Sequence, residues 1–540
     1  MRYHERTRRR GVNSPVYWLV RAFLQPFLQI YFRLGRNGRQ HIPAEGGVLL
    51  ASNHRSFLDP FVIGCCLRRP IFFVAKQELF KYRPVGWILN CLGAFPVRRG
   101  ESDEESVKTA LALLERGDAV VIFPEGTRIR RGALKQPKRG VGRLALESGA
   151  PVVPIAVHGS EHARRGLIFK PVKVKLRIGR PLTFPRVDGP SQSLATEVTA
   201  RIWPCVELQY EWLGGLPPLR KAAVVGAGSA GTATAALLAR AGLDVQLGCR
   251  DAGHAERIAT AGQNDDYLPG VALPENVVAS SLSDIEFAGL DLVVLAVPSS
   301  SLPQAVGSLG ARIGDRTAVL TLSKGLVQPL GTLPTRYVSD RVNARAVAFL
   351  GGPSHAAESV ERGAHVVLAS SDVPLRDQLG DVLAKAGLDV ERTDDVVGVQ
   401  LAGAAKNAAA LAAAAAGTDG MNAAGAAAAR VFAEVHTLAV KHGARTETFL
   451  GLAGAGDLVA TALAEHSRNR RAGELLGQGV PGGQIPAILP QAAEGISTVP
   501  LLVEALDRDG IPCPALDALC GLIEGRIDAS QWLASVRRAA

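Results

Sequence analysis

The sequence predicts three domains in succession: an α/β domain, a doubly wound α/β domain and an all-α domain. Short apolar runs typical of strands alternate with helical patterns between residues 45 and 180. A second strand–turn–helix pattern begins near residue 221, and alanine-rich sequence without β-branched runs follows residue 395. A chain of 540 residues is also too long for a single hydrophobic core.

Charge divides the chain into two halves of opposite sign. Residues 1–219 hold 35 Lys and Arg against 17 Asp and Glu, whereas the remainder holds 26 against 33. Between the halves, GGLPPLR has the glycine and proline content of a linker. We therefore expect a basic head and amphipathic segment at 1–34, a first domain at 35–213, a linker at 214–220, a second domain at 221–394 and a helical domain at 395–540.

Cysteine spacing and motif content limit the possible partners. The seven cysteines show no spacing typical of metal ligands, so we predict no metal site and expect reduced thiols in a cytoplasmic protein. No recognition motif for nucleic acid accompanies the basic residues, so we expect no nucleic-acid partner. The basic half should instead favour a small anionic ligand or an anionic surface.

Residues 1–34 join a basic head, MRYHERTRRRG, to an aromatic and leucine-rich segment. A signal peptide is disfavoured because no small-residue cleavage site follows and Arg21 interrupts the apolar run. A membrane span is disfavoured because the uncharged stretch 22–32 is short. The pattern favours a helix lying in the membrane interface. A helix packed into the core, behind a disordered basic tail, is the alternative.

Three motifs stand at strand ends in the first domain. Strands are expected at 47–52, 71–75, 119–123, 151–157 and 172–178, and a helix at 103–115. NHRSFLDP follows the first strand, GAFPVRRG occupies 93–100, and FPEGTR occupies 123–128. On its own, the pair His54 and Asp59 could as well be a surface histidine and a helix N-cap at a strand-to-helix turn as a functional pair. With a carboxylate beside it, however, a histidine can act as general base toward a hydroxyl. Arginines fork onto phosphate oxygens, so the motifs together indicate a phosphorylated alcohol as substrate.

In register, His54-x4-Asp59 and FPEGTR resemble the glycerolipid acyltransferases of the 1-acylglycerol-3-phosphate acyltransferase type, over residues 15–200. The resemblance implies an α/β glycerolipid acyltransferase domain in which His54 deprotonates the acceptor hydroxyl and Asp59 orients His54. It implies acyl-CoA or acyl carrier protein as acyl donor, with the motif residues 153–155 as a fourth block. The acceptor would be bound by Arg99, Glu125, Gly126, Thr127 and Arg128.

The second domain begins with a strand, a Gly-x-Gly-x-x-Gly turn and an alanine-rich helix, AAVVGAGSAGTATAALLARAG (222–242). The glycines Gly226, Gly228 and Gly231 allow a tight turn and a close approach of a pyrophosphate to the helix N-terminus, as in Rossmann domains. A strand at 243–250 follows and ends in Arg250 instead of an acidic residue, which suits a 2′-phosphate. NADPH is therefore plausible, and NADH is not excluded. Strands at 291–299 and 317–326 should continue the sheet.

Lys406 stands before a nine-residue Ala/Leu stretch in the predicted helical domain. Taken alone, it is more simply a lysine that extends from a helix end into solvent. In apolar surroundings, however, its pKa would be lowered, and it could exchange protons with a carbonyl oxygen.

Seven ordered pieces of residues 220–535 resemble NAD(P)-dependent glycerol-3-phosphate dehydrogenase: GAGSAGT, LSKGL, GGPSHA, AKN, GAGDLVAT, HSRNR and AEGIST. The resemblance implies that Lys406 is the proton donor and acceptor, and that NAD(P)H is the cofactor. Around the substrate it implies Lys324, Gly352, Ser354, Asp457, Ser467, Arg468 and Asn469. Around the cofactor it implies Ser229, Lys324, Ala356, Arg468 and Glu494, beside the three glycines and Arg250.

Together the two resemblances imply a bifunctional enzyme of phospholipid synthesis that makes sn-glycerol 3-phosphate and acylates it or its 1-acyl form. One alternative is a dehydrogenase whose N-terminal half only anchors it to a membrane. Another is acylation of dihydroxyacetone phosphate followed by reduction. We expect a cytoplasmic protein, peripheral on the inner face of the cell membrane, with a possible homodimer through the helical domain.

Overall fold

The computed structural model describes residues 2–97, 103–129, 133–165, 168–329, 331–464, 467–489 and 493–538. The chain divides into two compact units, Met1–Pro218 and Leu219–Ala540, and each is described by itself. The division falls inside the glycine- and proline-containing segment 214–220.

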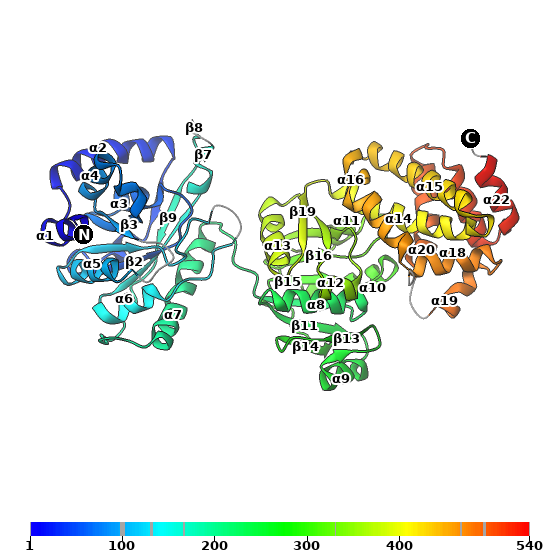
Figure 1. Ribbon diagram of the computed structural model, residues 1–540, viewed down its shortest axis with the longest axis horizontal. Helices are drawn as coiled ribbons and strands as arrows, with labels where there is room; N and C mark the ends of the chain where they lie inside the picture. The colour runs from blue at the N-terminus through cyan, green and yellow to red at the C-terminus, as the bar shows by residue number, and fades with distance from the viewer. Residues whose placement is uncertain are drawn as a thin grey trace. The chain divides into compact units, whose positions relative to one another are not determined.

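Unit 1 contains a seven-stranded sheet in the order β1-β9-β6-β2-β5-β3-β4 (Figure 1). Neighbouring strands are parallel except for β6 and β9, which are antiparallel. The strands are β1 Gly35–Asn37, β2 Val48–Ser52, β3 Ile71–Lys76, β4 Ala94–Val97, β5 Ala119–Ile122, β6 Val152–His158 and β9 Lys175–Ile178; β7 Arg164–Arg165 and β8 Ile168–Phe169 form a small hairpin.

Helices cover both faces of this sheet, and a separate apolar core lies on each face. One face carries α2 Ser14–Tyr31, α3 Asp59–Cys66 and α4 Arg83–Cys91, and the other carries α5 Glu104–Glu115, α6 Gly140–Ser148 and α7 Gln192–Trp212. Asp103 caps α5 by accepting a hydrogen bond from the amide of Ser106 at 3.2 Å. The apolar runs identified in the sequence thus form the buried strands β2, β3, β5 and β6.

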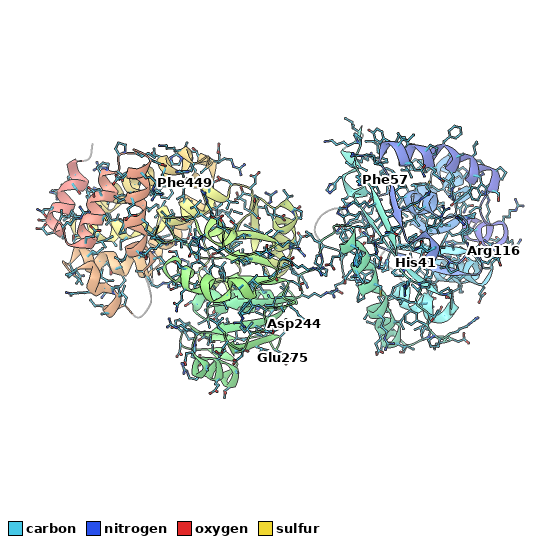
Figure 2. All side chains as sticks on the ribbon, turned by 180° about the vertical axis from the view of Figure 1, so that it is seen from behind. His41, Phe57, Arg116, Asp244, Glu275 and Phe449 are labelled. Carbon is cyan, nitrogen blue, oxygen red and sulfur yellow. The ribbon has the colours of Figure 1, made fainter. Side chains whose placement is uncertain are left out.

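The basic head is an ordered helix, α1 Arg2–Arg10, instead of a disordered tail. It packs on α5 and β4: His4 Nδ1 lies 2.9 Å from Thr109 Oγ1, and Arg8 forms an ion pair with Glu105 at 2.7 Å. Arg116, labelled in Figure 2, donates a hydrogen bond to the carbonyl of Thr7 at 3.2 Å. Helix α2 buries Tyr17 and Leu28 but exposes large apolar side chains along its outer face.

Unit 2 begins with an eight-stranded sheet in the order β14-β11-β10-β15-β16-β17-β18-β19. The first six strands run parallel, in the 3-2-1-4-5-6 arrangement of a Rossmann domain. Only the pairing of β17 with β18 is antiparallel. The strands are β10 Lys221–Val225, β11 Asp244–Cys249, β14 Val277–Ser281, β15 Leu292–Leu295, β16 Ala318–Thr321, β17 Ala346–Gly351, β18 His365–Ala369 and β19 Asp389–Thr393, with β12 Gln263–Asn264 and β13 Leu268–Ala272 in a separate pair.

Two groups of helices cover the faces of this second sheet. The core on one face includes side chains of α8 Ser229–Arg240, α9 Ala252–Ala261 and α13 Val373–Lys385; the core on the other includes those of α10 Leu302–Leu309 and α11 Pro334–Ser339. The short helix α12 Ala356–Glu361 contacts α8. The predicted fold class is confirmed for this unit as for unit 1.

The remainder of unit 2 is helical and is built around α14 Val396–Ala416 (Figure 1). The other helices are α15 Met421–Lys441, α16 Thr446–Leu450, α17 Asp457–Leu463, α18 Arg468–Gly477, α19 Ile485–Ile488, α20 Glu494–Arg508, α21 Pro514–Glu524 and α22 Ala529–Arg538. Phe449, labelled in Figure 2, is buried against the rings of Phe432 and His436.

Helix α18 approaches α14 very closely. A Cβ on Gly473 would lie 2.4 Å from the carbonyl oxygen of Leu411, and one on Gly477 would lie 2.7 Å from that of Ala415. By length and composition, the stretch Val396–Asp419 could cross a membrane, yet 83% of its most apolar window is buried inside the structure. Here α14 is the core helix of a domain.

Candidate active sites

His54 lies in the turn between β2 and α3, where the sheet of unit 1 ends. Its Nδ1 is 2.9 Å from Oδ2 of Asp59, and both side chains are buried. The imidazole stacks on the ring of Phe123, with 4.1 Å between ring centroids. Because Nδ1 faces a carboxylate, Nε2 is the nitrogen left to accept a proton.

Asp59 is held more tightly than the sequence motif indicates. Its Oδ2 also accepts hydrogen bonds from the amides of Arg55 and Ser56, both at 2.7 Å. Its Oδ1 accepts a hydrogen bond from the hydroxyl of Ser160 at 2.6 Å. Four donors, of which His54 Nδ1 is one, therefore surround this carboxylate, and the other three hold it in place to orient His54. Ser160 was missed in the sequence, because it lies 101 residues from Asp59 along the chain.

Glu125 joins two loops beneath the histidine. Its carboxylate accepts hydrogen bonds from the amide of His54 at 2.6 Å and from the amide of Lys135 at 3.1 Å. Burial raises the pKa of Glu125 to about 7. Glu125 therefore braces the turn beneath His54, whereas the resemblance assigned it to the acceptor.

Three further acyltransferase residues predicted from the sequence follow Glu125 in the same turn. Gly126 has a φ of 69°, which favours glycine. Thr127 and Arg128 come next and are half-buried. The turn is tied to the histidine because the amide of Ile129 donates a hydrogen bond to the carbonyl of His54 at 2.8 Å. Arg99 lies outside the described residues.

In unit 2, two lysines meet at one buried carboxylate. Lys324 Nζ lies 2.7 Å from Asp457 Oδ2, and Lys406 Nζ lies 3.4 Å from Asp457 Oδ1. Lys324 follows β16, Lys406 is in the middle of α14, and Asp457 begins α17, so three distant segments converge. Lys406 is buried, which contradicts a lysine extending into solvent.

Electrostatics in this cluster suit proton transfer. Burial and the neighbouring Lys324 ammonium lower the pKa of Lys406 to about 8. Burial opposes ionisation of Asp457, but the two ammonium groups outweigh it and hold its pKa below the usual value. Lys406 Nζ also donates a hydrogen bond to Thr461 Oγ1 at 2.9 Å. The sequence motif GAGDLVAT contained this threonine, but nothing in its spacing assigned it a role.

Hydrogen bonds connect Asn407, which follows Lys406, to the predicted cofactor residue Glu494 and to Asn469. Asn407 donates to Glu494 Oε2 at 3.2 Å, and Asn469 donates to Asn407 Oδ1 at 2.9 Å. The amide of Gly495 then donates to Asn469 Oδ1 at 2.9 Å. Burial raises the pKa of Glu494. Asn469 and Glu494, which the resemblance placed at substrate and cofactor, thus belong to one network in the structure.

The other predicted residues lie around this cluster or at the glycine turn. Gly352 accepts a hydrogen bond from Lys324 Nζ at 3.2 Å, and Ser354 donates to Gly352 at 3.3 Å. Ala356 begins α12, while Ser467 is the N-cap of α18 and Arg468 its first residue. Arg250 is exposed at the end of β11, and Ser229 begins α8.

The glycine turn between β10 and α8 fits a dinucleotide. Gly226 has a φ of 108°, and a Cβ on Gly231 would lie only 1.8 Å from the Gly226 carbonyl oxygen. A Cβ on Gly228 would meet nothing within 4 Å, so this side of the turn is open at the N-terminus of α8. Asn264, which the sequence reading missed, fixes the turn by donating to the Ala227 carbonyl at 2.9 Å and to Thr232 Oγ1 at 2.7 Å.

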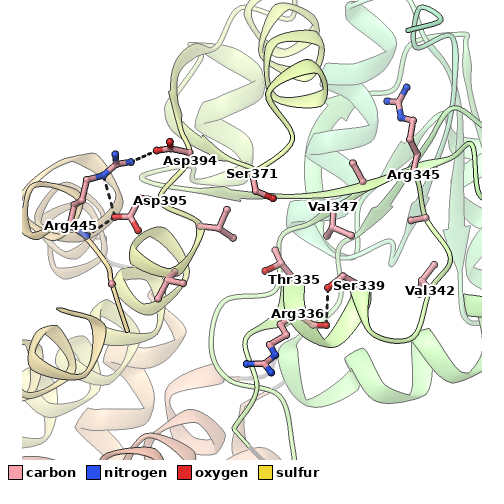
Figure 3. A pocket seen from close by; sticks show the side chains of 15 residues that line it. Thr335, Arg336, Ser339, Val342, Arg345, Val347, Ser371, Asp394, Asp395 and Arg445 are labelled. Carbon is pink, nitrogen blue, oxygen red and sulfur yellow. Dashed lines mark hydrogen bonds and ion pairs between the residues drawn. The ribbon is translucent and has the colours of Figure 1, made fainter. Parts of the chain in front are cut away.

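A cavity of about 640 Å³ lies elsewhere in unit 2, between α11, the start of α14 and the turn after α15 (Figure 3). None of its lining residues belongs to the Lys406 cluster. Arg445 on its wall is paired with Asp394 at 2.6 Å and donates its backbone amide to Asp395 at 2.9 Å. These contacts connect the helical part of the unit to the end of β19.

Comparisons with known proteins agree with the division of the chain into units 1 and 2. The family model described as Acyltransferase matches residues 34–158. The models for the N-terminus and C-terminus of NAD-dependent glycerol-3-phosphate dehydrogenase match residues 221–375 and 395–534.

Individual relatives match unit 2. A glycerol-3-phosphate dehydrogenase [NAD(P)+] from Clostridium perfringens is 33% identical over 305 residues, covering 55% of this chain and 91% of the relative. One from Bradyrhizobium sp. is 38% identical over 310 residues, covering 56% and 92%. The crystal structure of the Coxiella burnetii glycerol-3-phosphate dehydrogenase aligns with a TM-score of 0.56 at 30% identity, covering 59% of this chain and all of that one. The chain therefore belongs to the NAD(P)-dependent glycerol-3-phosphate dehydrogenase family and carries an acyltransferase-family domain in front of its dehydrogenase domains.

Proposed function

We propose that the chain is a bifunctional enzyme of glycerolipid synthesis. Unit 2 reduces dihydroxyacetone phosphate to sn-glycerol 3-phosphate with NAD(P)H, and unit 1 transfers an acyl group from a thioester to a hydroxyl of glycerol 3-phosphate or its 1-acyl form. The convergence of Lys324 and Lys406 on Asp457 carries the first assignment. The four-donor arrangement around Asp59, beside His54, supports the second.

In the reduction, the glycine turn would hold NAD(P)H, which would supply a hydride for the ketone carbon. Lys406 delivers a proton from Nζ to the oxygen, which would otherwise become an alkoxide, and recovers the proton from solvent. With a pKa of about 8, Lys406 is mostly protonated at neutral pH and still releases its proton readily. Asp457 holds both ammonium groups in place, and Lys324 offsets the charge of the substrate phosphate.

In acyl transfer, Nε2 of His54 takes the proton from the acceptor hydroxyl as the oxygen attacks the thioester carbonyl. The C–O bond forms, the C–S bond breaks, and the proton passes to the departing thiolate. Asp59 keeps Nδ1 protonated and stabilises the imidazolium that forms. The acyl donor is acyl-CoA or acyl carrier protein, and the arginine-rich character of unit 1 suits the phosphates of either donor and of the acceptor.

Unit 1 would act at the inner face of the cell membrane. The outer face of α2 exposes Trp18, Leu19, Phe23, Phe27 and Ile30. Helix α4 lies on the same side of the sheet and contacts α2. It and the residues just before it expose a further apolar set, which comprises Leu79, Tyr82, Val85, Trp87 and Ile88.

Exposed cations border this apolar face, among them Lys76, Lys81 and Arg83. Large apolar patches with aromatic side chains and a basic rim are typical of surfaces that insert into an anionic leaflet. Both a lysophospholipid acceptor and the acyl chain of the donor would be available there.

The activities are tested with the purified full-length chain. Labelled acyl-CoA is offered with glycerol 3-phosphate, 1-acylglycerol 3-phosphate or dihydroxyacetone phosphate, and the lipid products are separated by chromatography. Acylation of either glycerol phosphate supports the proposal. Acylation of dihydroxyacetone phosphate alone would instead indicate acylation before reduction. A chain that reduces dihydroxyacetone phosphate but acylates nothing would leave unit 1 as a membrane anchor.

Membrane binding is tested with point substitutions, because deleting residues 1–34 would also remove the buried contacts of His4 and Leu28. Phe23 and Ile30 are 75% and 80% exposed. Phe23→Ser with Ile30→Ser should move the protein from the pellet of anionic liposomes to the supernatant, most clearly at low salt. Leu208→Ser, at an exposed position of α7 on the other face of the sheet, is the matched control. Equal binding by both variants would exclude the α2 face as the docking surface.

A further inference from the structure

Arg55 follows the histidine in the sequence and is buried in unit 1. Its side chain is 1% exposed and extends into the interior. Nη1 donates a hydrogen bond to the carbonyl of Ile129 at 3.0 Å, and Nη2 donates to the hydroxyl of Tyr210 at 2.6 Å. The guanidinium carbon also lies 4.8 Å from the centre of the Tyr210 ring.

The backbone amide and the side chain of Arg55 both connect to the pair His54 and Asp59. Its backbone amide donates to Asp59 Oδ2, the oxygen that also faces His54 Nδ1. Its side chain donates a hydrogen bond to the carbonyl of Ile129, and the amide of Ile129 donates to the carbonyl of His54 at 2.8 Å. A shift of the guanidinium would therefore move Asp59's donor and the turn after Glu125 together.

Tyr210 is a fixed support for this arginine. It lies near the end of α7 and is 4% exposed, and burial raises the pKa of its hydroxyl well above the ordinary value. The first residues of the linker close over its ring: Gly215 donates its amide to the Tyr210 carbonyl at 3.0 Å, and a Cβ on Gly215 would lie 2.2 Å from a ring carbon. Only glycine allows the chain to pass so close.

We propose that Arg55 and Tyr210 are positioning residues for acyl transfer, which brace the His54–Asp59 turn against the last helix of unit 1. The acyltransferase family model ends at residue 158, so Tyr210 contributes from chain beyond the matched segment. The guanidinium is a buried cation, so the loss of an acceptor such as the Ile129 carbonyl or the Tyr210 hydroxyl would leave its buried charge less well compensated. This inference rests on the acyltransferase activity proposed for unit 1.

The principal test is Tyr210→Phe in the full-length chain. The phenylalanine keeps the ring against Gly215 and removes only the acceptor of Arg55 Nη2. We expect kcat for acyl transfer to fall about ten- to hundredfold, as a small misplacement of a catalytic group does, while KM for donor and acceptor stays within about twofold. Reduction by unit 2 should be unchanged. Leu208→Ala, at an exposed position of the same helix, should keep wild-type kcat.

A second variant, Arg55→Lys, keeps the charge but loses the planar fork that reaches both acceptors. It should lower kcat in the same direction. Unchanged kcat in both variants, or a rise in KM at constant kcat, would overturn the proposal. Melting temperatures are recorded in parallel, and rates are taken well below the transition of each variant.

A spectroscopic measurement separates this inference from the proposed activity. The full-length chain is labelled with 15N-histidine, and the Nδ1–H signal of His54 is assigned by comparison with His54→Ala. Tyr210→Phe should shift or broaden that signal, whereas Leu208→Ala should not. A wild-type chain that transfers no acyl group would refute the activity, yet the shift would still show that Tyr210 positions His54. An unaltered signal in Tyr210→Phe would refute the brace even in an active enzyme.

Discussion

Lys406 is the residue whose chemistry depends most on its surroundings. If it is the proton donor, Lys406→Met should lower the rate constant of reduction at least roughly a hundredfold. Lys406→Arg should restore little, because a guanidinium stays charged at neutral pH. NAD(P)H binding, measured by fluorescence titration, should survive in both variants. Near-normal turnover of Lys406→Met would return this lysine to a structural role.

The pH dependence of reduction should report the same group. With a pKa of about 8 in the folded chain, Lys406 loses its proton as the pH rises through 8. The reduction rate should therefore fall above that pH, while oxidation of glycerol 3-phosphate, which needs the free amine as base, should rise. The Asp457 carboxylate raises the pKa of Lys406. Asp457→Asn should consequently lower the pH at which kcat/KM for reduction begins to fall.

At this scale, motif residues could be read from the sequence but their partners could not. His54, Asp59, Lys324, Lys406 and Asp457 all stand in short recognisable strings, because each lies at or near a turn or helix that the local pattern marks. Ser160, Thr461 and Asn264 reach the sites only through tertiary contacts with residues far along the chain. Burial of Lys406 likewise depends on helices that pack around α14, such as α17, and no local window of sequence contains them.

The turn from β10 to α8 leaves no space for a side chain at Gly231. Gly231→Ala would bring a Cβ to 1.8 Å from the Gly226 carbonyl oxygen, so α8 must move away from β10. We expect NAD(P)H affinity to fall about five- to 150-fold, by analogy with overpacked cores that lose roughly 1–3 kcal/mol. Fluorescence titration measures it. Gly425→Ala in α15, where a Cβ meets nothing within 4 Å, is the matched control and should be slightly stabilising. Equal affinity in Gly231→Ala would mean that the helix adapts without disturbing the cofactor.

Strand and helix positions followed the sequence pattern closely, whereas the N-terminal segment did not. Apolar runs such as 119–123 became β5 because a strand buried on both faces must be continuously apolar. Residues 2–10 indicate only a basic head, with a disordered tail as the alternative, because charge dominates their composition. Thr109 and Glu105 of α5, and Arg116 just after it, hold helix α1 through contacts with its residues 4, 7 and 8, and they lie about a hundred residues away in the sequence.

For the whole molecule, two separable units predict two separable activities. His54→Ala should abolish acyl transfer and leave the reduction rate near wild type, whereas Lys406→Met should do the opposite. Mixing the two purified variants with dihydroxyacetone phosphate, NAD(P)H and acyl-CoA should restore acylated product if unit 1 accepts glycerol 3-phosphate. Product would then appear after a longer lag than with the wild type, because the intermediate must diffuse between molecules. Loss of both activities in either single variant would contradict independent units.

The contact between α18 and α14 limits how this part of the chain can vary. An enlarged side chain in a protein core can often be accommodated when a neighbouring side chain becomes smaller. At Gly473 and Gly477, however, the nearest atoms in the way are main-chain carbonyl oxygens, which no second substitution can remove. No second substitution can therefore compensate for a larger residue at either glycine. We expect both glycines to stay unchanged as related sequences diverge. In a library of single substitutions, these two glycines should tolerate almost nothing, while Gly425, near the start of the neighbouring helix α15, should accept alanine freely.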